Sequence, residues 1–295
     1  MKKSILKIIL FCFLTLIISC QTDLDKNEII PYSAIGGYND SDEIAPSNLI
    51  VKLSFEGDLE DQKNTITTPT NNNVSFVLGK KGKAYKGGSA SFAKYTNVDA
   101  RLVNATSITS AIWIKTVQHT GGAQCLFMLP KQTDFWGNIF ALIEGTTESS
   151  MIAKMHIQKD VVPAIPYSGQ FLEHIGANKL QDMYGKWKHL VWSYNENTSK
   201  YNIYLDGVKV VIPEELSNRF TNNPLTGGLP LGALSNSNVN GFILGGYQQH
   251  LGPPYNNPEV WMLNYTGLMD EFRMYNVALT DNEIKSLYLL EKQGR

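Results

Sequence analysis

Short runs of apolar residues alternate with polar positions over most of the chain, and glycine, asparagine or proline residues separate the runs. This period of two predicts strands, because alternate residues of a strand point to opposite faces of a sheet. Asp206-Gly207 lies between two such runs and is typical of a hairpin with a type I′ turn. The predicted strands are Leu49–Phe55, Ser75–Leu78, Ala90–Ala93, Ser107–Thr116, Gln124–Leu129, Asn138–Glu144, Met151–Gln158, Lys188–Asn195, Lys200–Leu205, Val208–Ile212, Gly241–Leu244 and Leu268–Tyr275.

Helical periodicity is confined to one segment near the end of the chain, Asp281–Leu290. A chain made almost entirely of strands closes most naturally as a sandwich or a jelly roll. We therefore predict an all-β fold, a two-sheet antiparallel jelly-roll sandwich with a short C-terminal helix. No internal repeat and no second domain are evident in the sequence.

The last predicted strand carries a carboxylate at an unexpected position. With a period of two, Asp270 shares a face with the apolar residues Leu268, Phe272 and Met274. A buried and unpaired carboxylate is costly. Asp270 should therefore have a partner, either a metal ion or a group of hydrogen-bond donors.

The first 19 residues read as an export signal rather than as part of the fold. Lys2 and Lys3 precede an apolar run that ends at Ile18, and the run is shorter than the ~20 residues that a membrane-spanning helix needs. The run ends in Ile-Ile-Ser-Cys, which resembles a bacterial lipobox. In that pattern Cys20 becomes the lipidated first residue; the alternatives are a plain secretory signal and an uncleaved anchor.

Residues 20–47 are polar and interrupted by glycine and proline, so we predict a flexible tether followed by a folded domain over residues 48–295. The acidic stretch directly after Cys20 resembles the surface-export signal of Bacteroidetes lipoproteins. These features predict a protein held to the outer membrane by a lipid anchor and exposed at the cell surface.

Charge, cysteine content and histidine spacing argue against a nucleic-acid binder, a disulfide within the domain and a histidine metal site. The formal net charge is -1, and the 26 Lys and Arg residues are scattered, whereas a nucleic-acid binder needs a basic stripe. Once Cys12 and Cys20 are set aside, Cys125 has no partner for a disulfide within the domain, and we interpret it as a small buried apolar residue. The five histidines have no metal-ligand spacing.

Six segments follow one another in a recognisable order between residue 49 and about residue 290. They are an opening strand and turn at 53–61, Gly-Lys-Lys-Gly-Lys-Ala-Tyr at 79–85, a strand containing Trp113 at 107–115, a Trp-Lys-His strand at 187–194, Tyr-Leu-Asp-Gly at 204–207, and GLMDEFRMYNVALTDNEI at 267–284. Together they resemble the laminin G-like, or concanavalin A-like, jelly-roll superfamily. The resemblance implies the fold, but the superfamily includes glycan-binding modules, protein-binding modules, structural domains and glucanases.

The resemblance also suggests a partner for Asp270. In bacterial members of the family, acidic residues of the opening turn and of the Asp-Glu strand often lie near calcium, which takes 6–8 oxygen ligands. It therefore implies a structural Ca²⁺ ion bound by Asp58 and Asp270. The alternative is that Asp270 accepts backbone N–H bonds, while Glu271 pairs with Arg273.

A possible catalytic motif is weak. Glu56, Asp58 and Glu60 have the E-x-D-x-E spacing that β-glucanases of this architecture use on a strand, where two carboxylates ~5–5.5 Å apart can act together. Gly57 and the polar residues that follow favour a solvated turn instead, and neither G-x-S-x-G nor H-E-x-x-H occurs. We predict that the protein is not an enzyme.

Aromatic loops are the stronger indication of function. One long loop precedes the last strand, at residues 245–265, and a shorter one lies at residues 134–138. Aromatic faces stack on the apolar faces of sugar rings, while amides and carboxylates meet the hydroxyls. The predicted ligand-binding residues are Trp136, Tyr247, Tyr255, Asn256, Asn257, Glu259 and Trp261.

These loops predict a non-catalytic domain that binds a polysaccharide or an oligosaccharide, for glycan capture at the cell surface. Two alternatives stay open. Trp136 and Trp261 would pack under their own loops, as buried aromatic residues often do. The partner would otherwise be a protein, because tyrosine and tryptophan are also favoured in protein interfaces.

Overall fold

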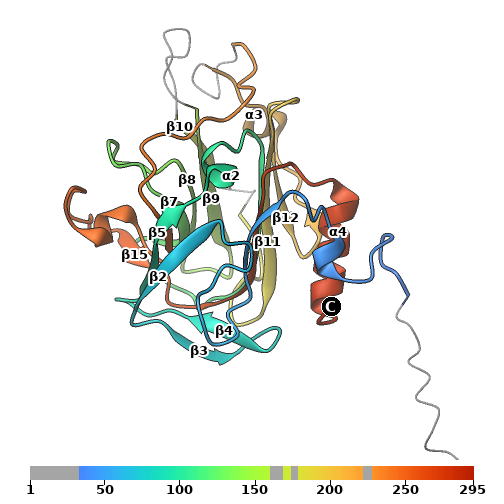
Figure 1. Ribbon diagram of the computed structural model, residues 1–295, viewed down its shortest axis with the longest axis horizontal. Helices are drawn as coiled ribbons and strands as arrows, with labels where there is room; N and C mark the ends of the chain where they lie inside the picture. Colours follow the sequence, from blue (N-terminus) through green and yellow to red (C-terminus); the bar gives the residue numbers. More distant parts are fainter. Residues whose placement is uncertain (1–32, 160–168, 174–178, 222–227) are drawn as a thin grey trace, which may run out of the picture. The chain divides into compact units, whose positions relative to one another are not determined.

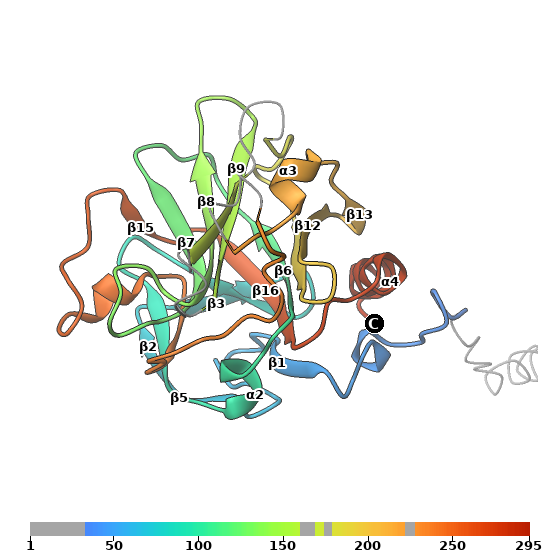
Figure 2. The same cartoon turned by 90° about the horizontal axis from the view of Figure 1, so that it is seen from above.

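The computed structural model describes residues 33–159, 169–173, 179–221 and 228–295, and residues 35–295 form one compact unit. Two antiparallel sheets pack face to face (Figures 1 and 2). The first, named here the β16 sheet, has the order β13 (Val208–Lys209), β12 (Lys200–Leu205), β11 (Lys188–Asn195), β6 (Ile108–Lys115), β16 (Leu268–Tyr275), β4 (Lys83–Lys86) and β3 (Ser75–Leu78), and β1 (Leu49–Leu53) also pairs with β16.

The second sheet, named here the β8 sheet, also has eight strands in the described part of the chain. Its order is β10 (Gly169–Glu173), β9 (Met151–Gln158), β8 (Ile139–Gly145), β7 (Ala123–Leu129), β14 (Phe242–Leu244), β5 (Phe92–Val98) and β2 (Ile66–Asn72). A short strand, β15 (Met262–Asn264), pairs with β7 in parallel, the one departure from antiparallel pairing among these strands. The short helical elements are η1 (Ser41–Glu43), α2 (Ala100–Val103), α3 (Glu214–Ser217) and η3 (Gln248–Leu251), and the long one is α4 (Asp281–Lys292).

The predicted fold class is confirmed. Strands β3, β9, β11, β12 and β16 begin and end at the predicted residues. Asp206 and Gly207 have φ values of 51° and 75°, as the central residues of a type I′ turn require. The sequence did not predict β2, β4, β10 and β15; β2 is polar and contains Pro69, which is tolerated because β2 lies at the edge of its sheet.

The main core lies between the two sheets. Phe127 stacks on Phe242 with ring centroids 6.1 Å apart, and Phe272 from the β16 sheet meets Phe127 at 5.1 Å. Trp192 and Met274 are also fully buried in this core. Burying a side chain of this size stabilises the fold by about 1.5–3 kcal/mol, so these contacts join the two sheets firmly.

The prediction that Asp270 shares the face of Phe272 and Met274 is wrong. The pairing of β16 with β6 is irregular between Asp270 and Arg273, and Glu271 has a positive φ of 44°. This β-bulge adds one residue to the alternation. Met269, Phe272 and Met274 therefore face the core, and Asp270 does not share their face.

Helix α4 covers the outer face of the β16 sheet (Figure 2). It begins at a capping box, in which Thr280 and Glu283 satisfy each other's backbone N–H groups. Its apolar side, with Ile284, Leu287 and Leu290, packs on a second buried cluster. The sequence pattern placed this helix correctly because its period of 3.6 is preserved over three turns.

The predicted domain start at residue 48 is too late. Residues 35–47 belong to the compact unit rather than to a tether, and Ile44 is fully buried. Asp42 binds Arg273 of β16 at 2.6 Å and Lys52 at 2.6 Å. The polar composition of this segment reflects ion pairs with the folded domain, not a free tether. The predicted signal segment and Cys20 lie outside the described residues.

Within the described parts of the chain, no helix has both the length and the apolar character to cross a bilayer.

Candidate functional site

Residues 245–266 fold over the outer face of the β8 sheet, on the side opposite α4 (Figures 1 and 2). The segment starts where Gly245 donates to the carbonyl of Leu126 and ends where β15 pairs with β7. Between these points it encloses a separate apolar cluster. The buried members of that cluster are Ala123, Cys125, Met128, Phe140, Leu142, Tyr247 and Met262.

The two aromatic loops predicted from the sequence meet on this face. The rings of Trp136 and Trp261 lie 5.8 Å apart. Trp136 also stacks on Phe140 at 5.9 Å, and Phe140 stacks on His156 at 4.7 Å. Both tryptophans are half-buried. Each therefore covers the sheet with one side of its ring system and presents the rest to solvent.

Tyr247 is a correction to the predicted contact surface. Its side chain is fully buried, and its hydroxyl donates to the carbonyl of Ala123 at 2.9 Å. Burial raises the pKa of Tyr247 well above its usual range, which keeps the hydroxyl a donor. The ring meets Trp261 edge to face at 5.9 Å. Tyr247 supports Trp261 from below and does not reach the surface.

Two glutamines of η3 fasten one loop to the other. Gln248 accepts from the backbone of Lys131 at 2.9 Å and donates to the carbonyl of Asp134 at 2.7 Å. Gln249 donates to the carbonyl of Phe135 at 2.7 Å. These bonds could not be predicted, because an amide that binds a distant backbone leaves no periodic pattern in the sequence.

A polar hollow of about 230 Å³ lies beside these glutamines. It contains two predicted residues, Tyr255 and Asn256. Tyr255 is 9% exposed and its hydroxyl donates to Asn240, so only its edge is available. The full lining is Gln132, Thr133, Asp134, Phe135, Gln248, Gln249, Pro254, Tyr255 and Asn256.

The other predicted polar residues, Asn257 and Glu259, are exposed on the same segment. Trp261 lines a further hollow of about 330 Å³ together with Gly122 and Glu144. The carboxylate of Glu144 is paired with Lys154 at 2.7 Å. Of the predicted residues, Tyr255 and Asn256 thus line the polar hollow and Trp261 lines this one, whereas Trp136, Tyr247, Asn257 and Glu259 line neither.

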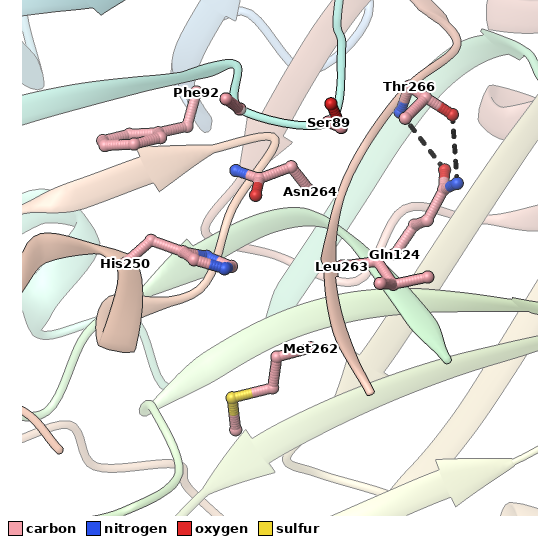
Figure 3. Close-up of a pocket in the computed structure, with 9 residues that line it drawn as sticks. Ser89, Phe92, Gln124, His250, Met262, Leu263, Asn264 and Thr266 are labelled. Atoms are coloured by element: carbon pink, nitrogen blue, oxygen red, sulfur yellow. Dashed lines mark hydrogen bonds between the residues drawn. The ribbon is translucent and has the colours of Figure 1, made fainter. Parts of the chain in front are cut away.

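A third hollow, of about 510 Å³, was not predicted (Figure 3). The rings of Phe92 and His250 form one wall, 6.5 Å apart and 25° from parallel. Asn264 lies between them in the view of Figure 3, and Gln124 and Thr266 bind each other on the far side. We call this the apolar hollow; its lining is Ser89, Ala90, Phe92, Gln124, His250, Met262, Leu263, Asn264 and Thr266.

Local bonds hold the walls of the apolar hollow in place. The Nδ2 of Asn264 donates to the carbonyl of Ser91 at 3.1 Å, which leaves its Oδ1 for a ligand. The Nδ1 of His250 accepts from the backbone of Tyr247 at 3.1 Å. Burial lowers the pKa of His250, so the ring is neutral at pH 7 and acts as an aromatic surface.

One signal could have revealed Phe92. In β5 the core residues are Ala93 and Tyr95, so alternation points Phe92 to the outer face. His250 offered no such signal, because its position depends on η3.

The E-x-D-x-E motif lies in a turn, as the alternative interpretation held. Strand β1 ends at Leu53, before the motif begins. Glu56 accepts from the backbone of Lys83 at 3.0 Å, and Asp58 accepts from the backbone of Glu60 at 3.1 Å. All three carboxylates are exposed. The motif therefore lacks the strand geometry that brings alternate carboxylates to one face.

Asp270 is held by backbone donors. Its Oδ2 accepts from Lys80 at 2.7 Å and from Lys81 at 3.0 Å, and its Oδ1 accepts from Glu271 at 2.9 Å. Gly79 permits this turn, because a Cβ there would lie 2.5 Å from Oδ2. Burial raises the pKa of Asp270 to about 7, although the three N–H groups oppose that shift.

These contacts match the alternative weighed for Asp270, and they leave little room for a cation beside Oδ2. The described residues contain no group of three or more His, Cys, Asp or Glu side chains placed to hold a metal. Asp58 sits in its exposed turn with a backbone partner of its own. A calcium ion shared by Asp58 and Asp270 stays a prediction.

The geometry defines a class of protein: a jelly roll whose one outer face is closed by a helix and whose other carries aromatic and amide-lined hollows. A sequence profile described as the concanavalin A-like lectin/glucanases superfamily, laminin G type, matches residues 86–285. The chain belongs to this superfamily, which confirms the resemblance of its six segments.

No curated protein sequence matches the chain significantly. Among solved structures it is similar to domain 4 of AbnA, a GH43 extracellular arabinanase from Geobacillus stearothermophilus, in complex with arabinotriose. The identity is 19% and the TM-score 0.52, over 81% of this chain and 98% of that one.

The chain is also similar to the binding domain of botulinum neurotoxin DC in complex with rat synaptotagmin II. The identity is 13% and the TM-score 0.54, over 83% of this chain but only 52% of that one, so this chain spans about half of that domain. At these identities the two likenesses show the fold alone.

Proposed function

We propose that this protein is a cell-envelope lipoprotein whose jelly roll binds carbohydrate without cleaving it, for glycan capture at the cell surface. The observation that carries the proposal is the apolar hollow. Its paired rings of Phe92 and His250 suit the apolar face of a sugar, and the amide of Asn264 suits its hydroxyls. Its volume of about 510 Å³ is typical of a small-ligand site.

The surrounding surface extends this contact. Trp136 and Trp261 expose part of their rings, and Asn256, Asn257 and Glu259 are exposed on the same segment. A longer saccharide bound in the apolar hollow would find further aromatic and polar groups along residues 255–261. The complex of the similar arabinanase domain with arabinotriose is in keeping with such a role.

Two features support binding without cleavage. Glycoside hydrolysis by the common mechanisms needs two carboxylates on either side of the scissile bond. No carboxylate is among the described residues that line the apolar hollow. Glu144, beside Trp261, is engaged by Lys154.

The export signal and the lipobox-like ending at Cys20 support a lipid anchor. Asp42 and Ser41 contact Arg273 on the β16 sheet, whereas the three hollows are lined by residues of the β8 sheet, of its adjoining loops and of residues 245–266. Residues 41 and 42, near the start of the compact unit, therefore do not cover these hollows. Metabolic labelling with palmitate tests the anchor: the wild type should incorporate label, and a Cys20→Ala variant that still carries label would contradict it.

A glycan array read in parallel with release of reducing sugar tests the binding function. We expect binding without release for the wild type, and at least tenfold weaker binding for Phe92→Ala. Release of reducing sugar would instead identify a hydrolase. Silence in both assays would contradict the proposal and favour a protein partner for the same face.

A further inference from the structure

The polar hollow beside η3 contains a buried acceptor without a partner. Gln249 is 3% exposed, and its Oε1 makes no hydrogen bond with any described residue. The orientation of the amide is fixed, because its Nε2 donates to the carbonyl of Phe135 at 2.7 Å. Turning the amide over would set two oxygens against each other. An acceptor held in this way calls for a donor from outside the protein.

The neighbouring Gln248 provides a contrast within the same hollow. Its Oε1 accepts from Lys131, and its Nε2 lies within bonding distance of three carbonyls, those of Lys131, Asp134 and Phe135. All of its hydrogen-bonding capacity is used to fasten the two loops together. Gln249 uses one bond for the same purpose, and its Oε1 stays buried without a described partner.

The rim of the hollow adds further acceptors. Asp134 is exposed and uses one carboxylate oxygen, Oδ1, to accept from the backbone of Trp136 at 3.2 Å. Asn256, which is exposed, also lines the hollow. Phe135 and Pro254 supply apolar walls. A ligand for this hollow should therefore carry several donors on a partly apolar frame, as a sugar ring does.

The volume of the polar hollow and the charge of its lining restrict the class of ligand that it can bind. A volume of about 230 Å³ is below the ~300–1,000 Å³ of most small-ligand sites, which suits one sugar residue rather than a chain. The lining has a single carboxylate, which is exposed and therefore screened by salt. This favours a neutral ligand over an organic cation.

We propose that the polar hollow is a subsite for one neutral sugar residue with free vicinal hydroxyls, one donating to Oε1 of Gln249 and the next to the carboxylate of Asp134. This inference rests on the proposed carbohydrate-binding function and adds to it a second subsite with its own specificity. His250 lines the apolar hollow and Gln249 the polar one. The turn η3 thus separates the two subsites.

Calorimetric titration with methyl glycosides of glucose, galactose, mannose, arabinose and xylose, and with their monodeoxy derivatives, tests the subsite. We expect one glycoside to bind the wild type at least tenfold more tightly than one of its monodeoxy derivatives. Gln249→Met should remove that preference, binding both compounds equally. Gln158→Met is the matched control: it replaces a buried amide that lies outside the hollows and should keep the preference.

Asp134→Asn gives a second test that does not depend on the loop contact, because the introduced amide keeps an oxygen that can accept from the backbone of Trp136. It should weaken binding of the same glycoside and leave the melting temperature unchanged. A deoxy preference that survives Gln249→Met would overturn the subsite. Affinity that falls steeply with added salt would also overturn it, in favour of a cation.

Failure of the subsite can be told from failure of the function. Glycan binding that is lost in Phe92→Ala but unchanged in Gln249→Met and Asp134→Asn would leave the proposed function intact and remove the subsite alone. Absence of all glycan binding would remove both.

Discussion

Each sheet of the sandwich has its outer face covered by a segment from the C-terminal part of the chain, but the two covers differ in kind. Helix α4 closes the face of the β16 sheet, where Arg273 binds Glu291 at 2.7 Å, Glu271 at 3.1 Å and Asp42 at 2.6 Å. Arg273, Glu271 and Glu291 are almost fully buried. The buried charged side chains of this cover are therefore paired with one another.

Residues 245–266 cover the outer face of the β8 sheet less tightly. We call this segment the open cover, and helix α4 on the β16 sheet the closed cover. Three hollows border this segment. Half-buried tryptophans replace the regular apolar side of a helix. The segments that resemble the superfamily build the closed cover, whereas the loop outside those segments builds the open one. We therefore assign the fold signature to stability and propose the additional loop as the place for recognition.

The largest expected loss of stability comes from a substitution under helix α4. Arg273→Met leaves Glu271 and Glu291 buried without their cation, and breaking such a pair typically costs about 3–5 kcal/mol. Chemical denaturation should show this loss in the free energy of unfolding. Arg101→Met is the matched control, because its exposed pair with Asp99 should contribute below about 1 kcal/mol. Similar losses in both variants would contradict the distinction between the covers.

The second prediction compares two aromatic residues of the open cover, one that supports the loop and one that we propose to contact the glycan. Trp136→Ala removes a ring that stacks on Phe140 and Trp261, and should lower the free energy of unfolding by about 2 kcal/mol. Phe92→Ala should cost less stability but more glycan affinity. Melting temperatures and glycan titrations of both variants give the comparison. A reversed order would show that Trp136 is the binding platform and Phe92 the support.

The sequence predicted the closed cover well and the open cover only in outline. Regular alternation marked the ends of β16 to the residue, and helical periodicity marked those of α4 to within two residues. The bulge at Glu271 was missed because a single positive φ leaves no trace in a pattern of apolar residues. The docked segment around Asp42 was missed because its ion pair with Arg273 joins residues more than 200 positions apart.

The open cover depends on contacts that no local pattern encodes. The two aromatic loops predicted from the sequence do meet on one face. Local patterns could not tell that Tyr247 is buried while Phe92 and His250 face a hollow, because that difference follows from how η3 and β15 lie on the sheet. Burial of an aromatic ring in a loop is decided by tertiary packing rather than by its neighbours in sequence.

A smaller effect is expected on the pH dependence of stability, through Asp270 beside the β-bulge. The pKa of Asp270 is raised from 3.8 to about 7 in the folded protein, so between about pH 4 and 7 the folded state binds a proton that the unfolded state has lost. Its contribution to stability is therefore greatest at low pH and declines as the pH rises to about 7. The difference in unfolding free energy between the wild type and Asp270→Asn should follow this course.

Asp42 titrates in a different range and does not obscure this result. Although burial raises its pKa, hydrogen bonds from Lys52 and Arg273 lower it to about 2. Its contribution is present above about pH 4 and is lost as the pH falls toward 2. A difference between wild type and Asp270→Asn that is flat from about pH 4 to 8 would show that the three backbone donors keep Asp270 ionised throughout.

The smallest expected change in stability, that of Asp58→Asn, tests the predicted calcium site. If a structural ion joined Asp58 to Asp270, Asp58→Asn would lower the melting temperature in calcium but not in a chelator. The observed backbone bonds of both residues predict instead that Asp58→Asn behaves as a surface substitution, within about 0.5 kcal/mol in either buffer. Asp270→Ala should then lose the same stability with and without calcium, because its partners are N–H groups of the chain. If both variants lost stability only in calcium, the result would support a bound Ca²⁺ ion. The bulge of β16 would then be part of a metal site, rather than a turn held only by backbone N–H groups.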